Sequence, residues 1–94
     1  MLGYNCPVRI SRLLWDDDTI EHIAQHGVRP EEIEQTCQAH PYVLRTHGGR
    51  YIVLGRSDAG RYLTVILAPH GRDAWKPITA RPMDEAERRR YERR

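Results

Sequence analysis

The stretch that decides the fold runs Arg50-Tyr-Ile-Val-Leu-Gly-Arg56, Ser57-Asp-Ala-Gly60, Arg61-Tyr-Leu-Thr-Val-Ile-Leu67. Two runs rich in β-branched and aromatic residues flank a polar segment that contains glycine, which is the pattern of a β-hairpin. If the turn closes over 57–60, Arg56 lies opposite Arg61 on one face of the sheet. Like charges directly opposite each other are destabilising, so this pair requires a neighbouring acid or a bound anion.

The alternation of apolar and polar residues extends to both sides of this hairpin. The expected strands are Ile10–Trp15, Tyr42–Thr46, Arg50–Arg56, Arg61–Ala68 and Trp75–Ala80. On this register one buried face carries Ile52, Leu54, Leu63, Val65, Leu67, Ile78 and Ala80. The opposite face then carries Tyr51, Tyr62, Trp75 and Thr79.

Capping signals predict three helices. The first starts after Asp16 and stops at Gly27, and the second starts at Pro30 and ends at His40. Asp84 forms a capping box that opens a last, basic helix from Glu85 to about Arg93. We therefore expect an α+β fold, with two N-terminal helices packed on a four- to five-stranded antiparallel sheet and a short C-terminal helix.

Charge is distributed unevenly along this chain of 94 residues, which we expect to form a single domain over 1–94. Residues 1–40 carry three Arg against seven acids, a net −4, and residues 41–94 carry twelve Lys or Arg against six acids, a net +6. Arginine is well shaped for bidentate contact with phosphate. The asymmetry suggests a nucleic acid or an acidic protein as partner, or simply solvated helix faces.

Several classes of protein and site are not indicated. Cys6 and Cys37 are isolated, so neither a disulfide framework nor a zinc ribbon is expected. His22 and His26 have the i, i+4 spacing of metal ligands but lack a third, so we expect no metal and no cofactor. The N-terminus has no signal-peptide pattern, and the apolar run 62–68 is too short to span a bilayer. A cytoplasmic location without membrane contact is expected.

Motifs in order along the chain resemble the BrnT family of bacterial toxins. They are Leu14-Trp-Asp16, His26-Gly-Val28, Leu54-Gly-Arg-Ser57 with Gly60-Arg61, and Thr79-Ala-Arg81 with Glu87-Arg-Arg-Arg-Tyr-Glu92. The resemblance covers 13–92 and leaves 1–11 as an N-terminal extension. Gln25 and Pro82 depart from the family pattern, and the stretch before the central hairpin is shorter than usual.

The resemblance implies a RelE-like ribonuclease fold and a metal-independent reaction, in which the 2′-OH of the RNA attacks the adjacent phosphate. That chemistry needs cations for the phosphoryl oxygens, a base and an acid. The candidate catalytic residues are His26, Arg56, Arg61, Arg81, Glu87 and Tyr91. The candidate RNA-binding residues are Tyr51, Tyr62, Trp75, Arg88, Arg90, Arg93 and Arg94.

Structural roles compete with each of these assignments. The arginines can pair with Asp58, Glu87 or carbonyl groups, His26 can favour a helix C-terminus, and Tyr91 can anchor the last helix in the core. Exposed aromatics beside arginines suit single-stranded RNA, but they are also typical of protein interfaces.

The resemblance also implies a partner, a cognate antitoxin with a ribbon-helix-helix-type DNA-binding domain, in a hetero-oligomer with the toxin. The leading hypothesis is therefore a toxin of a type II toxin–antitoxin system that cleaves RNA. The alternative is a catalytically degenerate RNA- or protein-binding module with the same fold, which Gln25 and Pro82 keep open.

Overall fold

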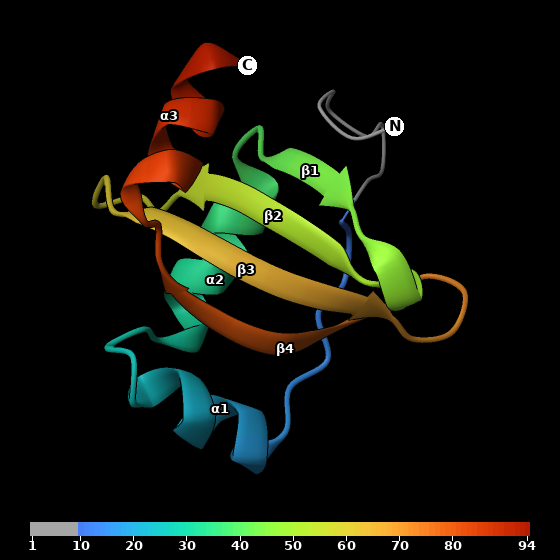
Figure 1. The fold of residues 1–94 in the computed structure, drawn as a ribbon. Coiled ribbons are helices and arrows are strands. Elements are labelled where there is room, and N and C mark those ends of the chain that lie inside the picture. The colour runs from blue at the N-terminus through green and yellow to red at the C-terminus, as the bar shows by residue number, and fades with distance from the viewer. Residues whose placement is uncertain (1–9) are drawn as a thin grey trace.

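A computed structural model describes residues 10–94 of the chain. The elements are α1 (Asp17–Ala24), α2 (Pro30–Gln38), β1 (Tyr42–Arg45), a 3₁₀ turn η1 (His47–Gly49), β2 (Tyr51–Arg56), β3 (Tyr62–Pro69), β4 (Trp75–Pro82) and α3 (Glu85–Arg93). The strands form one antiparallel sheet in the order β1-β2-β3-β4 (Figure 1). The expected α+β class is confirmed. The predictions about a signal peptide, Cys6 and most of the N-terminal extension fall on residues 1–9, outside the described part.

The expected strand at 10–15 is wrong. This segment is extended, but it makes only one isolated parallel bridge, between Leu13 and Trp75. Backbone hydrogen bonds from Leu14 to Trp75 and from Trp75 to Arg12 tie it to the start of β4. It lacks the continued pairing that a fifth strand requires.

The helices begin where the capping signals predict. The Asp16 side chain accepts a hydrogen bond from the Thr19 backbone at 2.7 Å and caps α1. At the start of α2, the Glu32 carboxylate accepts from the Arg29 backbone at 3.0 Å, although Arg29 is no standard cap residue. Asp84 and Glu87 form the reciprocal capping box of α3, with bonds of 2.8 and 2.9 Å.

The two faces of the sheet are covered by different helices. In Figure 1, α2 lies behind the sheet, α3 lies in front of one end of it, and α1 lies beyond β4. The α2 face, which holds the larger core, carries Val43, Val53, Leu63, Val65, Leu67 and Ala80 against Ile23, Val28, Ile33 and Cys37 of the α1–α2 region. The α3 face carries a smaller cluster of Tyr42, Leu44 and Leu54 with Tyr91 of α3, flanked by Ile52, Tyr62 and Met83.

The register of the central hairpin differs by one residue from the expected one. Arg56 pairs with Tyr62, and the five residues 57–61 form the connection. The Ser57 backbone donates to the Arg61 carbonyl, and Gly60 adopts φ +88°. A shift of one residue turns every side chain of one strand to the other face. Arg56 and Arg61 therefore do not face each other.

The same shift corrects the predicted buried face. Leu63, Val65, Leu67 and Ala80 lie on the α2 face as a group, but Ile52 and Leu54 belong to the α3 side. The β3–β4 pairing shifts at Ile66–Leu67, and Ile78 has no partner in the ladder. Both faces carry an apolar cluster, because α2 packs on one face and α3 packs on one end of the other (Figure 1). Alternation alone therefore does not reveal which face a given residue takes.

One glycine in the hairpin allows α2 to approach the sheet. A Cβ atom at Gly55 would lie 2.8 Å from the Thr36 Cγ2 atom and 3.1 Å from the Thr36 carbonyl oxygen. Thr36 is fully buried and its hydroxyl donates to the Glu32 carbonyl within α2. The close contact therefore requires glycine at position 55 on steric grounds.

Candidate active site on the α3 face

Arg81 is held by an acid across the junction of β4 and α3. Its two terminal nitrogens donate to the two Glu87 carboxylate oxygens, each at 2.8 Å. Such a bidentate pair fixes the plane of the guanidinium as well as its position. The Arg81 side chain remains 44% exposed. Arg81 is thus a cation of fixed orientation that still reaches solvent.

Glu87 is held in turn by two further donors. The Thr64 hydroxyl donates to its carboxylate at 2.9 Å, and the Asp84 backbone N–H donates at 2.9 Å. Partial burial raises the pKa of Glu87, but the hydrogen bonds from Arg81, Asp84 and Thr64 outweigh that effect and hold the pKa below its usual value. A carboxylate in this state is a poor proton acceptor, and it is well suited to orienting Arg81.

Two further cations meet at the ring of Tyr62. The guanidinium carbons of Arg56 and Arg88 lie 4.7 and 4.0 Å from the ring centroid. Tyr62 and Thr64 are two residues apart on β3 and share the α3 face, about 7 Å apart along the strand. This cluster therefore lies beside the Arg81–Glu87 pair.

Arg56 is the least restrained cation of this cluster. Its Nε donates weakly to the Gly60 carbonyl at 3.4 Å, and within residues 10–94 it forms no ion pair. Arg88, in contrast, pairs with Glu92 at 3.4 Å. Because both arginines lie against the Tyr62 ring, stacking of a base on this ring would require one of them to move. Tyr62 is better suited to holding the two cations than to holding a base.

Arg61 lies on the other face and has a different partner. Its Nη1 donates to the Gly27 carbonyl at 2.8 Å and to both Glu32 carboxylate oxygens at 3.0 Å. Glu32 is only 8% exposed. Burial raises the pKa of Glu32, but hydrogen bonds from the Arg29 backbone and from Arg61 outweigh it and lower the pKa overall. Arg61 joins the end of α1, the start of α2 and the hairpin, so the geometry favours a structural role.

Tyr91 is buried in the small core of the α3 face. The side chain is 6% exposed, packs with Tyr42, Leu44 and Leu54, and meets the Tyr62 ring edge-on at 5.9 Å. Within the described residues its hydroxyl makes no hydrogen bond. These contacts are those of an anchor for α3.

His26 is exposed just past the end of α1, and its ring meets His22 at 5.3 Å. The His22 Nε2 atom lies 3.0 Å from the Thr79 hydroxyl. Thr79 is two residues before Arg81 on the same face of β4, about 7 Å along the strand. His22 was not among the predicted catalytic residues. Its spacing with His26 was the available signal, and only the fold brings it to β4.

Two of the predicted RNA-binding aromatics lie on the α2 face and not, as predicted, on the same face as Tyr62. Tyr51 and Trp75 pack against the α2-face core and meet each other edge-on at 5.0 Å. The one-residue register shift moves Tyr51 to the face opposite Tyr62. The remaining predicted cations, Arg90, Arg93 and Arg94, belong to the C-terminal half of α3 and line a hollow together with Tyr42 of β1.

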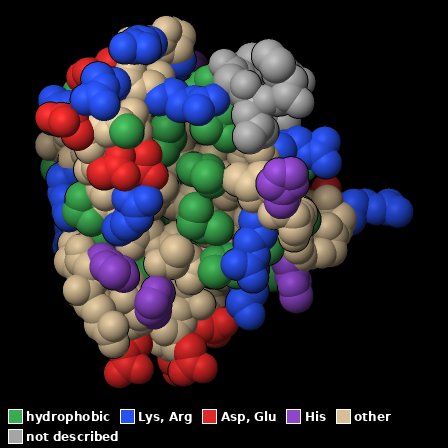
Figure 2. Space-filling view, in the orientation of Figure 1, with side chains coloured by type: hydrophobic (Ala, Val, Ile, Leu, Met, Phe, Trp, Pro, Cys, Tyr) green, Lys and Arg blue, Asp and Glu red, His purple; other side chains and the backbone are tan. Residues whose placement is uncertain are grey.

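Basic side chains gather over α3, where acidic ones lie between them (Figure 2). Within residues 10–94 no three His, Cys, Asp or Glu side chains are placed to hold a metal ion. No helix in the same range is long and apolar enough to cross a membrane.

Comparisons with known proteins show the family to which the chain belongs. No curated protein matches at a significant level. The crystal structure of the ribonuclease toxin BrnT of Brucella abortus is similar, with a TM-score of 0.65 and 23% sequence identity, and the match covers 80% of this chain and all of that one. The family model described as the ribonuclease toxin BrnT of type II toxin–antitoxin systems matches residues 15–87. The chain therefore belongs to the BrnT family of ribonuclease toxins.

Proposed function

We propose that this protein is an endoribonuclease toxin of the RelE-like type, which cleaves RNA without a metal ion and is neutralised by a cognate antitoxin. The observation that carries the proposal is Arg81, which Glu87 orients by two hydrogen bonds while 44% of its side chain stays exposed. A preoriented cation is the group that phosphoryl transfer needs for the charge that develops on the phosphate oxygens.

The reaction we propose starts with attack of the RNA 2′-OH on the adjacent phosphorus. The bond from phosphorus to the 5′-oxygen breaks, which leaves a 2′,3′-cyclic phosphate on one fragment and a 5′-OH on the other. Arg81 and Arg56 stabilise the phosphoryl oxygens, and Glu87 positions Arg81. One proton must leave the 2′-OH and one must reach the 5′-oxygen.

For the proton transfers we propose His22 and His26. Histidine is the side chain most often used as a general acid or base. The His22 Nε2 atom lies 3.0 Å from the Thr79 hydroxyl, on the same face of β4 as Arg81, and the His26 ring meets the His22 ring. Glu87 is the weaker candidate, because its hydrogen bonds lower its pKa and occupy its oxygens. Replacing each histidine singly by Ala should lower kcat by roughly 10²–10⁴-fold, as loss of a general acid or base does, and an unchanged kcat in both variants would exclude them.

The test of the whole proposal is RNA cleavage by the purified chain in the presence of EDTA. Wild-type protein should produce fragments with cyclic phosphate ends, and Arg81→Ala should lower kcat by roughly 10²–10³-fold. Glu87→Gln should lower it less, because the amide still orients the guanidinium in part. Activity that disappears with EDTA and returns with a divalent ion would refute metal independence.

The antitoxin part of the proposal rests on the family. Type II systems pair a toxin with a protein antitoxin, and we propose an antitoxin of the ribbon-helix-helix type in a hetero-oligomer with this chain. A small adjacent reading frame whose product co-purifies with the chain and blocks cleavage is the expected result. A chain that binds RNA but neither cuts it nor slows growth would instead be the degenerate module.

A further inference from the structure

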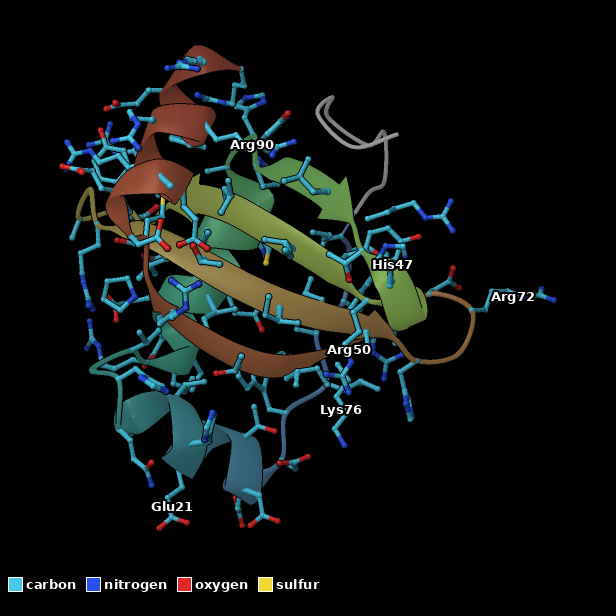
Figure 3. All side chains as sticks on the ribbon, viewed as in Figure 1. Glu21, His47, Arg50, Arg72, Lys76 and Arg90 are labelled. Atoms are coloured by element: carbon cyan, nitrogen blue, oxygen red, sulfur yellow. The ribbon has the colours of Figure 1, made fainter. Side chains whose placement is uncertain are left out.

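A hollow of about 410 Å³ lies on the flank of α3 that faces β1. The lining residues are Tyr42, Ala86, Arg89, Arg90, Arg93 and Arg94. We call this site the arginine hollow. Figure 3 shows Arg90 on α3, on the side of the helix toward β1. We propose that the arginine hollow is a second subsite for RNA, which binds a backbone phosphate away from the Arg81 site.

The first argument is uncompensated charge. Among the residues that the structure describes, no acidic one lines the hollow. Arg89 pairs with Glu85 at 3.3 Å, but both side chains are more than half exposed, so this pair contributes little. Arg90 and Arg93 form no hydrogen bond or ion pair within residues 10–94. Cations in a last helical turn complement the helix dipole, but like charges one turn apart destabilise the helix. A bound anion would relieve this repulsion.

The second argument is a hydroxyl group, that of Tyr42, without a hydrogen-bond partner among the described residues. Tyr42 is 4% exposed, and its hydroxyl has no hydrogen-bond partner among the described residues. In the same part of the chain no fully buried side-chain oxygen or nitrogen lacks a partner. The Tyr42 hydroxyl therefore reaches solvent, and Tyr42 lines the hollow. Its hydroxyl adds a donor to those of the arginines that line the same hollow.

The third argument concerns the class of ligand. A protein partner would require an apolar centre in the interface, but among the described residues the lining adds only Ala86 and the Tyr42 ring to the arginines. Planar guanidinium groups suit phosphate, and each of the arginines presents several donors. An RNA strand that crosses α3 would meet Arg88 on one flank and the hollow on the other. The charges thus favour RNA over an acidic protein segment.

The test measures the affinity of the full chain for a 2′-O-methyl oligoribonucleotide as a function of salt concentration. This probe has no free 2′-OH and resists the proposed cleavage. Each phosphate contact to a single strand contributes about 0.7 to the slope of log K against log [salt]. Arg90→Ala with Arg93→Ala should lower the magnitude of the slope by about 0.7–1.4. Tyr42→Phe should weaken binding about two- to tenfold, as the loss of one hydrogen bond predicts.

A matched control removes the same charge elsewhere. Arg12 and Arg72 are exposed, Arg12 beside the start of β4 and Arg72 on the loop that projects away from α3 (Figure 3). Their double Ala variant should keep the wild-type slope. If both double variants lower the slope equally, the effect is general charge and the inference is wrong. If only affinity for the antitoxin falls in the Arg90 and Arg93 variant, the hollow binds acidic protein, which also overturns it.

This inference rests on the proposed function only for the class of ligand, and the two can fail separately. Cleavage of unmodified RNA by the wild type, together with a slope that the Arg90 and Arg93 substitutions leave unchanged, would refute the subsite alone. A slope that falls as expected in a protein that cuts no RNA would refute the ribonuclease proposal and leave the subsite standing.

Discussion

Replacing Arg61 by Ala tests whether the two arginines of the central hairpin have separate roles. The substitution removes the hydrogen bonds to Gly27 and Glu32 and leaves the Glu32 carboxylate, which is 8% exposed, without its cation. Loss of one member of a fully buried ion pair costs about 3–5 kcal/mol. Arg61 is 38% exposed and all these bonds share one nitrogen, so we expect about 2 kcal/mol after allowing for solvent screening.

The assay is thermal and urea unfolding of the variant beside the wild type. For a domain of this size, 2 kcal/mol lowers Tm by roughly 8–16 °C. In a double-mutant cycle with Glu32→Gln, the double variant should lose less free energy of unfolding than the two single variants lose together. Each single variant already breaks the same interaction. Arg56→Ala is the matched control. It should stay within about 0.5 kcal/mol of wild-type stability and lose RNA cleavage instead.

The opposite pattern would refute the assignment. If Arg61→Ala unfolds like the wild type but cuts no RNA, Arg61 contacts the substrate and its bond to Glu32 is incidental. If Arg56→Ala is the variant that unfolds early, the register and contacts of the hairpin are not as described.

Further changes test other parts of the fold. Gly55→Ala should lower the free energy of unfolding by about 1–3 kcal/mol through overpacking. Thr36→Ser removes the Cγ2 atom that the new Cβ atom would contact, and it should restore part of that loss. Equal losses with Thr36 and with Ser at this position would contradict the steric argument. The lowered pKa of Glu32 means that its contribution to the free energy of unfolding is present above the unfolded-state pKa near 4.5 and is lost as pH falls through the folded value. Glu32→Gln should therefore flatten the acid side of the curve of unfolding free energy against pH. A curve parallel to that of the wild type would argue against this role. Burial raises the pKa of Cys37 to about 12, so this thiol should resist iodoacetamide at pH 8 until the protein is unfolded, as peptide mapping can check. Tyr91→Phe should leave both stability and cleavage unchanged, whereas loss of cleavage alone would make its hydroxyl catalytic.

Local signals predicted the elements of this fold well. The caps at Asp16 and Asp84 and the Pro30 start are local features, and the four strands of the sheet begin and end within two residues of the predicted positions. The number of residues in one turn was harder to predict. The Ser57–Arg61 connection holds one residue more than predicted, and in this arrangement Arg61 bonds with Gly27 and Glu32, which lie 34 and 29 positions earlier in the chain. No pattern within the hairpin carries that information.

The candidate site was predictable in composition but not in arrangement. Arg81 and Glu87 are close in sequence, and both were named, although the sequence left open whether Glu87 acts as a base or as a support. The hydrogen bond from Thr64 that completes their network joins residues 23 apart. Tyr51 was misplaced because both faces of the sheet are apolar, which removes the contrast on which alternation depends.

The way α3 is attached has a consequence for how the protein responds to heat. Only Tyr91 of this nine-residue helix is buried, and a helix so short does not persist in water without tertiary contacts. Release of α3 from the sheet is therefore the same event as its unfolding, and it separates Glu87 from Arg81. Amide hydrogens in α3 should exchange faster than those of β2 and β3, through a subglobal opening. Catalytic competence would then decline at temperatures where the rest of the sheet is still folded.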